Sequence, residues 1–415
     1  MPWKERSRGE CRFMKIAILV AFVLGQSARA ESLSQCDEMK GPNDVLNCVV
    51  SSHSETKIMQ SRWEEALAGV DAASQRPNPE LDIESTGQGG TTGVSFLHTF
   101  ELGGKRLARI LAAKSEIAAS KASLQSTREQ LVVRTVLRLY RLRQINHELD
   151  VISEITETFQ RIINQYSQAG RLSPEDKMAV SVFHMAFEES RLKTSTLRNE
   201  KQEIISSIEA GTGRQIEFDS NLLPKVKRQW KKKAMAGSLA GAEIIEARAR
   251  VGMAESRYRM ADSAAWQNLT VGPKFEVEHR DEPKTRIGIS LSFPLPLYQA
   301  NEGKKAQELA GVNATKLQLS YTQTRLKRQR EFLYRTYNRI SQVISRTLSK
   351  GRIGLKHKDL HKLISRGIVS APIVIEMHRQ IMDYYEILHS QELEGVQALW
   401  QISALEGRID REILK

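Results

Sequence analysis

Two histidine–methionine pairs are the residues whose chemistry first suggests a metal site in this chain. They are His184-Met185 and Met377-His378, and each lies in a stretch with helical periodicity. Imidazole and thioether groups bind metal ions, but a protein site needs three or four ligands that converge on the ion. One pair on one helix does not supply them. We therefore interpret both pairs as solvated or packed helix residues and predict neither a metal site nor a cofactor.

Groups that would carry out catalysis are also not arranged for it. The sequence contains no phosphate-cradling glycine loop, no nucleophile elbow and no paired histidine or carboxylate spacing. Hydrophobic residues make up 40% of the 415 residues and charged residues 27%, which excludes a helical membrane protein. The sequence therefore predicts no enzyme, and the function has to be inferred from the predicted helices and strands.

The N-terminus has the pattern of a secretory signal peptide. Arg12 and Lys15 precede one continuously apolar run, Ile16–Leu24, and Ala28-Arg29-Ala30 follows it. A basic segment, a short apolar segment and a small-residue site together indicate cleavage. The apolar run is shorter than the roughly 18 residues that a membrane anchor needs. We predict that residues 1–30 are removed, with Met14 as an alternative start.

Export of the chain bears on what its charge and its cysteines can do. The whole chain has a net charge of +13, spread along its length, and an exported chain with dispersed charge is not expected to bind nucleic acid. The strongest basic run, Lys225–Lys233, indicates a solvated linker, with contact to an adaptor or to peptidoglycan as the alternative. Cys36 and Cys48 remain after cleavage. An oxidising compartment permits a disulfide between them, and the sequence leaves the pairing open.

Long helices dominate the mature chain. No glycine or proline occurs from Lys105 to Ala169 or from Glu175 to Ala210. From Val132 to Tyr166 the apolar positions recur in steps of three and four, which predicts an amphipathic helix with a coiled-coil-like stripe. Such a helix would be roughly 95 Å long at 1.5 Å per residue. A coiled-coil spacer has the same pattern, so periodicity alone does not decide the function.

The chain repeats itself after about 200 residues. Gly104-Lys105-Arg106 opens the first long helix, and Gly303-Lys304-Lys305 opens another 199 residues later. Gly170 and Gly367 end these helices, 197 residues apart, where a left-handed glycine can cap each helix before Ser and Pro start the next. We therefore predict two helical hairpins in a duplicated chain. The predicted divisions are the signal peptide (1–30), a first repeat (31–225), a basic connector (226–237) and a second repeat (238–415).

Four short segments alternate with period two, which predicts half-buried strands. The apolar positions are Leu81 and Ile83 in the first segment, Val94, Phe96, His98 and Phe100 in the second, Phe275 and Val277 in the third, and Ile287, Ile289, Leu291 and Phe293 in the fourth. Turns at 87–90 and 281–284 pair them into two hairpins. In an exported protein, strands with one apolar and one polar face fit a transmembrane barrel. A small soluble sheet that caps the coiled coil is the alternative.

This order of elements resembles the TolC family of outer-membrane efflux proteins over the whole mature chain. Local matches point to its CzcC/CusC-like heavy-metal branch: Asn78–Glu84, Glu101–Arg106, Phe293–Tyr298 and Asn301–Gly303. The last three contain the residues expected at the strand-to-helix junctions, where glycine and proline release the ladder. These residues are Gly103, Gly104, Pro294, Pro296, Asn301 and Gly303.

The resemblance implies a mainly α fold with a small β part. Three subunits would each give four transmembrane strands to a 12-stranded barrel, and their helical hairpins would form a periplasmic tunnel. It also implies a homotrimer in outer-membrane lipid, a periplasmic adaptor (membrane fusion protein), and an inner-membrane pump of the resistance-nodulation-division type. The expected function is a passive exit duct for heavy-metal cations. The alternatives are a duct for drugs or for type I protein secretion, or a periplasmic coiled-coil adaptor or scaffold.

In such channels the turns between the helices lie at the periplasmic tip and dock the adaptor. Here the turns are Gly170, Arg171, Leu172 and Ser173 in the first repeat, and Gly367, Ile368, Val369 and Ser370 in the second. Acidic residues just beyond the turns narrow the closed tip in the family, and Asp176 and Glu376 are the candidates here. Threefold symmetry would turn each into a ring of carboxylates. The alternative is that both only complement the helix dipole. Ile373 and Val369 replace charged residues of some relatives.

Overall fold

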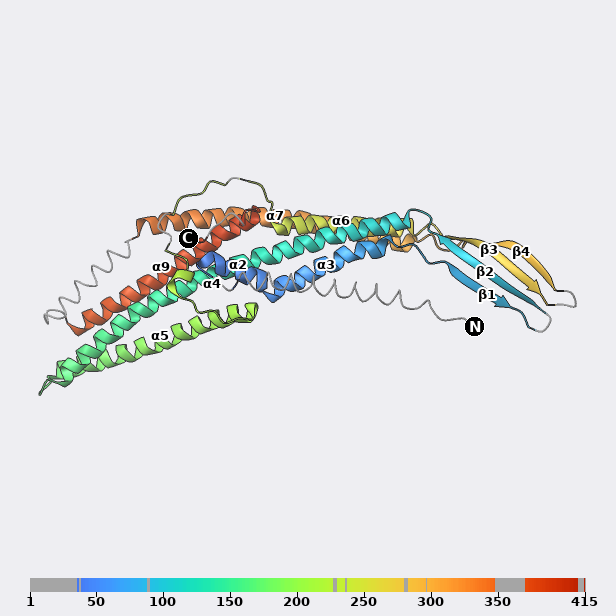
Figure 1. The fold of residues 1–415 in the computed structure, drawn as a ribbon. Helices are drawn as coiled ribbons and strands as arrows, with labels where there is room; N and C mark the ends of the chain where they lie inside the picture. Colours follow the sequence, from blue (N-terminus) through green and yellow to red (C-terminus); the bar gives the residue numbers. More distant parts are fainter. Residues whose placement is uncertain are drawn as a thin grey trace, which may run out of the picture. The chain divides into compact units, whose positions relative to one another are not determined.

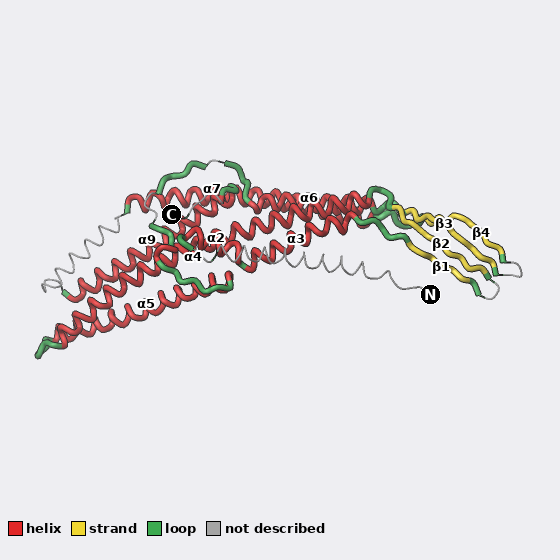
Figure 2. The backbone as a smooth tube through the Cα atoms, viewed as in Figure 1, coloured by secondary structure: helices red, strands yellow, loops and turns green. Residues whose placement is uncertain are grey.

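The computed structural model describes residues 36, 39–87, 90–226, 230–235, 237–279, 283–295, 297–347, 370–409 and 414. The predicted signal peptide, residues 367–369 of the second tip turn, and Pro296 lie outside these ranges. The described chain consists of helices and one small sheet (Figures 1 and 2). Among its described helices, none combines the length and the apolar character needed to cross a membrane.

The elements of the two predicted repeats follow one another in the same order. The first has α3 (Ser54–Ser74), β1 (Glu80–Ser85), β2 (Thr91–Phe100), α4 (Lys105–Ser167) and α5 (Pro174–Thr212). The second has α6 (Ala242–Ser263), β3 (Leu269–Glu278), β4 (Lys284–Ser292), α7 (Glu302–Arg346) and α9 (Ala371–Leu405). Also within the predicted first repeat, the helix α2 (Pro42–Ser52) comes before these elements and the 3-10 helix η1 (Ser220–Leu222) comes after them. The predicted α-rich fold with a small β part is confirmed.

The register of the duplication differs by two residues from the predicted one at the start of the long helices. The carbonyl of Gly104 accepts the first helical bond of α4 from Ala108 N, at 2.9 Å. The carbonyl of Asn301 does the same in α7 for Lys305 N, at 3.0 Å. Gly104 therefore corresponds to Asn301, and the pairing with Gly303 was wrong because Gly303 lies inside α7. The offset is then 197 residues, as it is between Ser173 and Ser370, the N-cap residues of α5 and α9.

Two compact units divide the chain, and each draws on both repeats. One unit contains residues 1–57, 128–237 and 330–415, and the other contains 58–127 and 238–329. The core of the first unit joins apolar side chains of α2, α4, α7 and α9. These include Val45, Leu139, Ile340 and Ile402, each of which is fully buried. The repeats are thus sequence units rather than separate cores.

A disulfide joins Cys36 to Cys48 in the first unit. The sequence had left this pairing open. Cys48 lies in α2 and is fully buried, so the bond holds the preceding segment against this helix. Cys36 is 6% exposed, which places the whole bridge in the interior.

All four strands form one antiparallel sheet in the order β1-β2-β3-β4 (Figure 1). The two predicted hairpins, β1–β2 and β3–β4, are confirmed. They are joined because β2 also pairs with β3, with Val94 opposite Phe275 and His98 opposite Val271. Two hairpins that would be marginal alone therefore support one another in a four-stranded sheet.

Candidate functional site

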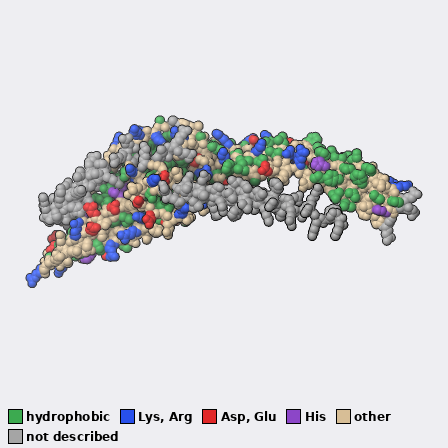
Figure 3. Space-filling model, in the orientation of Figure 1, with side chains coloured by type: hydrophobic (Ala, Val, Ile, Leu, Met, Phe, Trp, Pro, Cys, Tyr) green, Lys and Arg blue, Asp and Glu red, His purple; other side chains and the backbone are tan. Residues whose placement is uncertain are grey.

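One face of the sheet is apolar and exposed. The register places Ile83, Val94, Phe275 and Ile287 in one row across the four strands, and successive side chains alternate between faces. The outer strands are the most exposed: Ile287 is 76% exposed and Ile289 80%. Figure 3 shows hydrophobic side chains gathered over this part of the chain. An exposed apolar surface of this kind marks contact with a partner or with lipid.

The opposite face of the sheet is polar. Lys274 Nζ lies 2.9 Å from Glu276 Oε1 and 3.4 Å from Glu84 Oε2. Thr99 Oγ1 and Thr270 Oγ1 are hydrogen-bonded at 2.9 Å. The sheet therefore separates apolar from charged side chains by face, as the period-two pattern predicted.

The strand-to-helix junctions use left-handed backbone. Gly103 and Gly104 have φ angles of 68° and 74°, and Asn301 has 59°. A Cβ atom on Gly103 would lie 2.6 Å from Cβ of Trp266, so both conformation and space require glycine there. Asn301 tolerates its conformation with the help of a 2.7 Å bond from Nδ2 to the Ala261 carbonyl. Pro294 follows β4 in the described coil.

The first tip turn connects α4 to α5 and is mostly exposed. Gly170, Arg171 and Ser173 are exposed and Leu172 is half-buried. Gly170 does not have a positive φ, so its predicted left-handed cap is wrong. The helix ends instead with bonds from Gln168 N to Asn164 O and from Ala169 N to Tyr166 O. Of the second turn, Ser370 is described and occupies the N-cap position of α9, where its side chain makes no capping hydrogen bond.

The two gate candidates lie near the N-termini of α5 and α9, but not at equivalent positions. Asp176 completes a capping box: its Oδ2 accepts from Ser173 N at 3.2 Å, and its own N–H donates to Ser173 Oγ at 3.1 Å. Counted from the N-caps, Asp176 corresponds to Ile373, which is 58% exposed. The helix-capping interpretation of Asp176 therefore describes what it does within one chain.

Glu376 is held by a neighbour on its own helix. Its two carboxylate oxygens accept bonds of 2.8 and 2.9 Å from the guanidinium of Arg379. These bonds, with a further one from Gln380, lower the pKa of Glu376. The carboxylate is exposed and ionised, and it is partly neutralised by the arginine.

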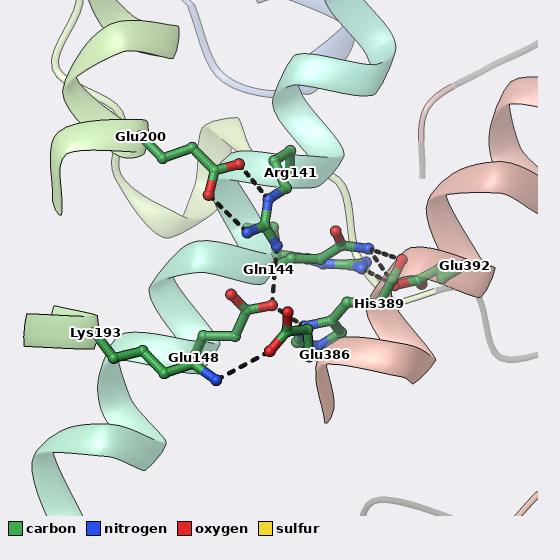
Figure 4. Close-up of polar contacts among 9 residues, drawn as sticks. Arg141, Gln144, Glu148, Lys193, Glu200, Glu386, His389 and Glu392 are labelled. Atoms are coloured by element: carbon green, nitrogen blue, oxygen red, sulfur yellow. Dashed lines mark hydrogen bonds and ion pairs between the residues drawn. The ribbon is translucent and has the colours of Figure 1, made fainter. Parts of the chain in front are cut away.

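A buried polar network joins α4, α5 and α9, and sequence reasoning missed it (Figure 4). Arg141 Nε and Nη2 donate to the two carboxylate oxygens of Glu200 at 2.6 and 2.7 Å. Arg141 Nη1 also donates to Glu148 Oε1 at 2.9 Å, and His389 Nδ1 lies 2.6 Å from the same oxygen. Glu148 is 3% exposed and His389 1%. Arg141 of α4 thus bonds to Glu200 of α5, and Glu148 of α4 contacts His389 of α9.

The environment of Glu148 keeps it ionised. Burial is the largest influence and raises its pKa, but the hydrogen bonds from His389 and Arg141 together outweigh it, so the pKa is lowered. An ionised carboxylate can only accept, so Nδ1 of His389 carries the proton in this bond. A second branch runs beside the first: Gln144 Nε2 donates to Glu392 Oε2 at 3.1 Å and to the His389 carbonyl at 3.0 Å. Arg143 pairs with Glu392 as well.

The remaining chemical candidates have structural explanations. His184 is exposed, whereas His378 is buried with Nδ1 2.8 Å from the Val374 carbonyl. Among the residues that the structure describes, no three histidine, cysteine or acidic side chains are grouped to hold a metal ion.

The described residues of the basic connector (226–237) are attached to α7. The interpretation of the basic run as a solvated linker was therefore wrong for this part. Trp230 is 9% exposed and its carbonyl accepts from Ser341 Oγ at 2.7 Å. Lys233 exchanges two bonds of 2.9 Å with the side chain of Asn338. The sequence showed the lysines but gave no sign that the tryptophan among them is an anchor. Lys231 and Lys232 are exposed.

Comparison with known proteins agrees with this architecture. The sequence is 23% identical over 351 residues to the cobalt-zinc-cadmium resistance protein CzcC of Cupriavidus metallidurans, covering 77% of this chain and 80% of CzcC. The fold is similar to that of the CmeC outer-membrane channel of Campylobacter jejuni, with a TM-score of 0.70 and 13% identity over 89% of this chain and 86% of CmeC. It is also similar to CusC, with a TM-score of 0.62 and 13% identity over 88% and 91% of the two chains. No protein-family model matches the sequence.

These similarities agree with the resemblance that the sequence motifs suggested. The similar structures are membrane channels, and none of the similar proteins is named as an enzyme. The long paired helices and the four-stranded sheet account for the match over nearly the whole chain. The chain is therefore a homologue of CzcC with the fold of the TolC-family outer-membrane channels.

Proposed function

We propose that this chain is the outer-membrane exit duct of a tripartite efflux system and that it exports heavy-metal cations. The observation that carries the proposal is the sheet with one exposed apolar face and one ion-paired face. Four strands are too few to close a barrel, whereas twelve from three copies suffice. The apolar face would then contact lipid and the charged face would line the lumen.

The helical hairpins suit a periplasmic tunnel. Residues 170–173 and 367–370 would form the tip that docks a periplasmic adaptor, and an inner-membrane pump of the resistance-nodulation-division type would supply the energy. Asp176 and Glu376 would form rings of carboxylates that attract cations to the tip. The capping box does not prevent this role, because Asp176 takes part in it as a hydrogen-bond acceptor. No chemical step is involved.

The cargo is inferred from the relative CzcC, a cobalt-zinc-cadmium resistance protein. Weak attraction of cations suits a duct better than tight binding, because an ion must leave the channel as readily as it enters. A duct for drugs or for secreted proteins remains the competing assignment, and the phenotype of a deletion strain separates them.

The first experiment is fractionation of cells that express the chain, followed by electrophoresis of the detergent-extracted outer membrane without heating. We expect a trimer in this fraction that dissociates on heating. A monomer in the soluble periplasm would contradict the channel and favour a coiled-coil scaffold. A deletion strain should then become sensitive to cobalt, zinc and cadmium salts, and unchanged metal tolerance with new drug sensitivity would reassign the cargo.

The gate is tested by conductance in planar bilayers. Asp176→Asn preserves an acceptor for the Ser173 bonds but removes the charge. Cation selectivity should fall in this variant and in Glu376→Gln. A matched exposed acid on α5, Glu188, serves as control through Glu188→Gln, which should leave selectivity unchanged.

A further inference from the structure

Positive charge collects on the surface where the basic connector runs along α7. Arg335, Arg339 and Arg346 of α7 are exposed and lie four and seven residues apart, so they share one face of the helix. Lys231 and Lys232 of the connector are exposed as well. We call these five residues the basic strip.

The attachment of the connector brings the two lysines to the arginine face of α7. Three hydrogen-bonded contacts join the connector to α7: Trp230 with Ser341, Lys233 with Asn338, and Gly237 with Arg330. Residue numbers rise along the connector while they fall along α7, so the two segments run antiparallel. Lys231 and Lys232 therefore lie beside the turn of α7 that carries Arg339.

A buried tryptophan holds the lysines in this position. Trp230 is 9% exposed, and the centroid of its ring lies 5.9 Å from that of Tyr337 in α7. Gly395 of α9 leaves room for the indole, because a Cβ atom there would lie 2.5 Å from the ring. The backbone next to Lys231 is thus anchored in the core. Cations on an anchored backbone lose less conformational freedom when they bind a partner than cations on a free linker do.

No acidic side chain offsets the charge of the basic strip. None of its five residues is paired with a carboxylate in the part of the chain that the structure describes. By contrast, the exposed Arg379 of α9 is held 2.8 Å from Glu376 on its own helix. Between residues 330 and 346, α7 has four arginines and one acid, Glu331. The strip is therefore a site of net positive charge rather than a face of alternating ion pairs.

The strip has the chemistry to bind a polymer of carboxylates. Arg335 and Arg339 are like charges one helical turn apart, which repel one another, and an anion between them would relieve this repulsion. A guanidinium group binds a carboxylate through two parallel hydrogen bonds. Nucleic acid is not the expected partner of an exported chain, and the proposed adaptor contact lies at the tip turns. Peptidoglycan is a periplasmic polymer whose peptide stems carry free carboxylates.

We propose that the basic strip binds the carboxylates of peptidoglycan stem peptides. This inference rests on the proposed channel function, which puts the helical hairpins in the periplasm, and it gives the connector a role in holding the duct in the cell wall. The contact is electrostatic and lies at an exposed surface, so binding weakens as the salt concentration rises.

Cosedimentation of the detergent-extracted, full-length protein with purified peptidoglycan sacculi tests the strip. Arg335→Gln/Arg339→Gln and Lys231→Gln/Lys232→Gln each remove two exposed charges. The matched control is Arg248→Gln/Arg259→Gln on α6, which also removes two exposed charges. We expect the bound fraction to fall by roughly fivefold or more in each strip variant and by less than about twofold in the control. Because all these positions are exposed, helix content by circular dichroism should be unchanged.

The chemistry of the ligand is tested on the sacculi themselves. Conversion of their carboxylates to neutral amides, with a carbodiimide and ethanolamine, should abolish binding of the wild-type protein. Equal binding to amidated and untreated sacculi would overturn the assignment of carboxylates as the ligand.

Cross-linking in cells gives a second readout. A carbodiimide joins a lysine amine directly to a carboxylate, so wild-type protein should stay attached to sacculi that are boiled in detergent. Lys231→Arg/Lys232→Arg keeps both charges but removes both amines. This variant should cosediment like the wild type, whereas its covalent attachment should fall by roughly threefold or more. Undiminished attachment would place the contact elsewhere on the chain and overturn the strip.

The outcomes separate this inference from the proposed function. A soluble periplasmic monomer would overturn the proposed function and this inference with it. An outer-membrane trimer that does not sediment with sacculi, or whose strip variants bind as the Arg248→Gln/Arg259→Gln control does, would overturn the strip and leave the channel intact.

Discussion

Replacement of Glu148 by leucine should loosen the attachment of α9 to α4. The carboxylate accepts from Arg141 at 2.9 Å and contacts His389 at 2.6 Å, and its side chain is only 5% exposed. Leucine has a similar size but no acceptor. Glu148→Leu therefore leaves the buried Nδ1 proton of His389 without its partner, while Arg141 keeps both bonds to Glu200.

The expected free-energy cost of Glu148→Leu follows from the bonds that His389 and Arg141 lose. Removal of one partner from a buried ion pair typically costs about 3–5 kcal/mol. We take the lower end, about 3 kcal/mol, because Arg141 retains a bidentate partner and is 23% exposed. A free energy of about 3 kcal/mol corresponds to a change of about a hundredfold in an opening equilibrium.

Hydrogen exchange of α9 amides, followed by mass spectrometry, measures this opening directly. Protection of α9 should fall about a hundredfold in Glu148→Leu. The matched control is Glu188→Leu on α5, whose partner Arg191 is 62% exposed; an exposed pair contributes about 0–1 kcal/mol, so protection should change less than about fivefold. A loss of less than tenfold in Glu148→Leu, or an equal loss in both variants, would refute the assignment of the network as the attachment of α9.

Three further predictions concern pH, backbone and sheet. The pKa of Glu148 is lowered in the folded chain, so its ionised carboxylate stabilises the fold above the ordinary carboxyl pKa of 4.5, and this stabilisation is lost as pH falls through the lower folded value. The protection of α9 amides from exchange should therefore fall more on acidification in the wild type than in Glu148→Gln. Gly103→Ala should lower the thermal midpoint, because a left-handed alanine costs about 1–2 kcal/mol and its Cβ meets Trp266; an unchanged midpoint would contradict the junction geometry. Ile289→Arg, on the apolar face, should cost about 2–4 kcal/mol of insertion and reduce the outer-membrane fraction, whereas Ser290→Arg on the other face should not; equal fractions would argue against lipid contact.

Local patterns of the sequence predicted the elements but not all their connections. Long runs without glycine or proline predicted α4 and α5, since propensity and apolar spacing act within one helix. Alternation predicted the strands for the same reason. The left-handed cap at Gly170 was wrong, because a glycine permits that conformation without requiring it. The pairing of Gly104 with Gly303 was wrong because the matching junction residue, Asn301, has a different side chain and the same backbone conformation.

The network around Glu148 could not be predicted from the sequence for a different reason. Glu148 and His389 are 241 residues apart, and nothing local to either residue indicates a partner. From the sequence alone, each polar residue on an amphipathic helix is predicted to lie on a solvated face. Only the packing of α4 against α9 turns these positions inward, where the carboxylate and the imidazole must satisfy one another.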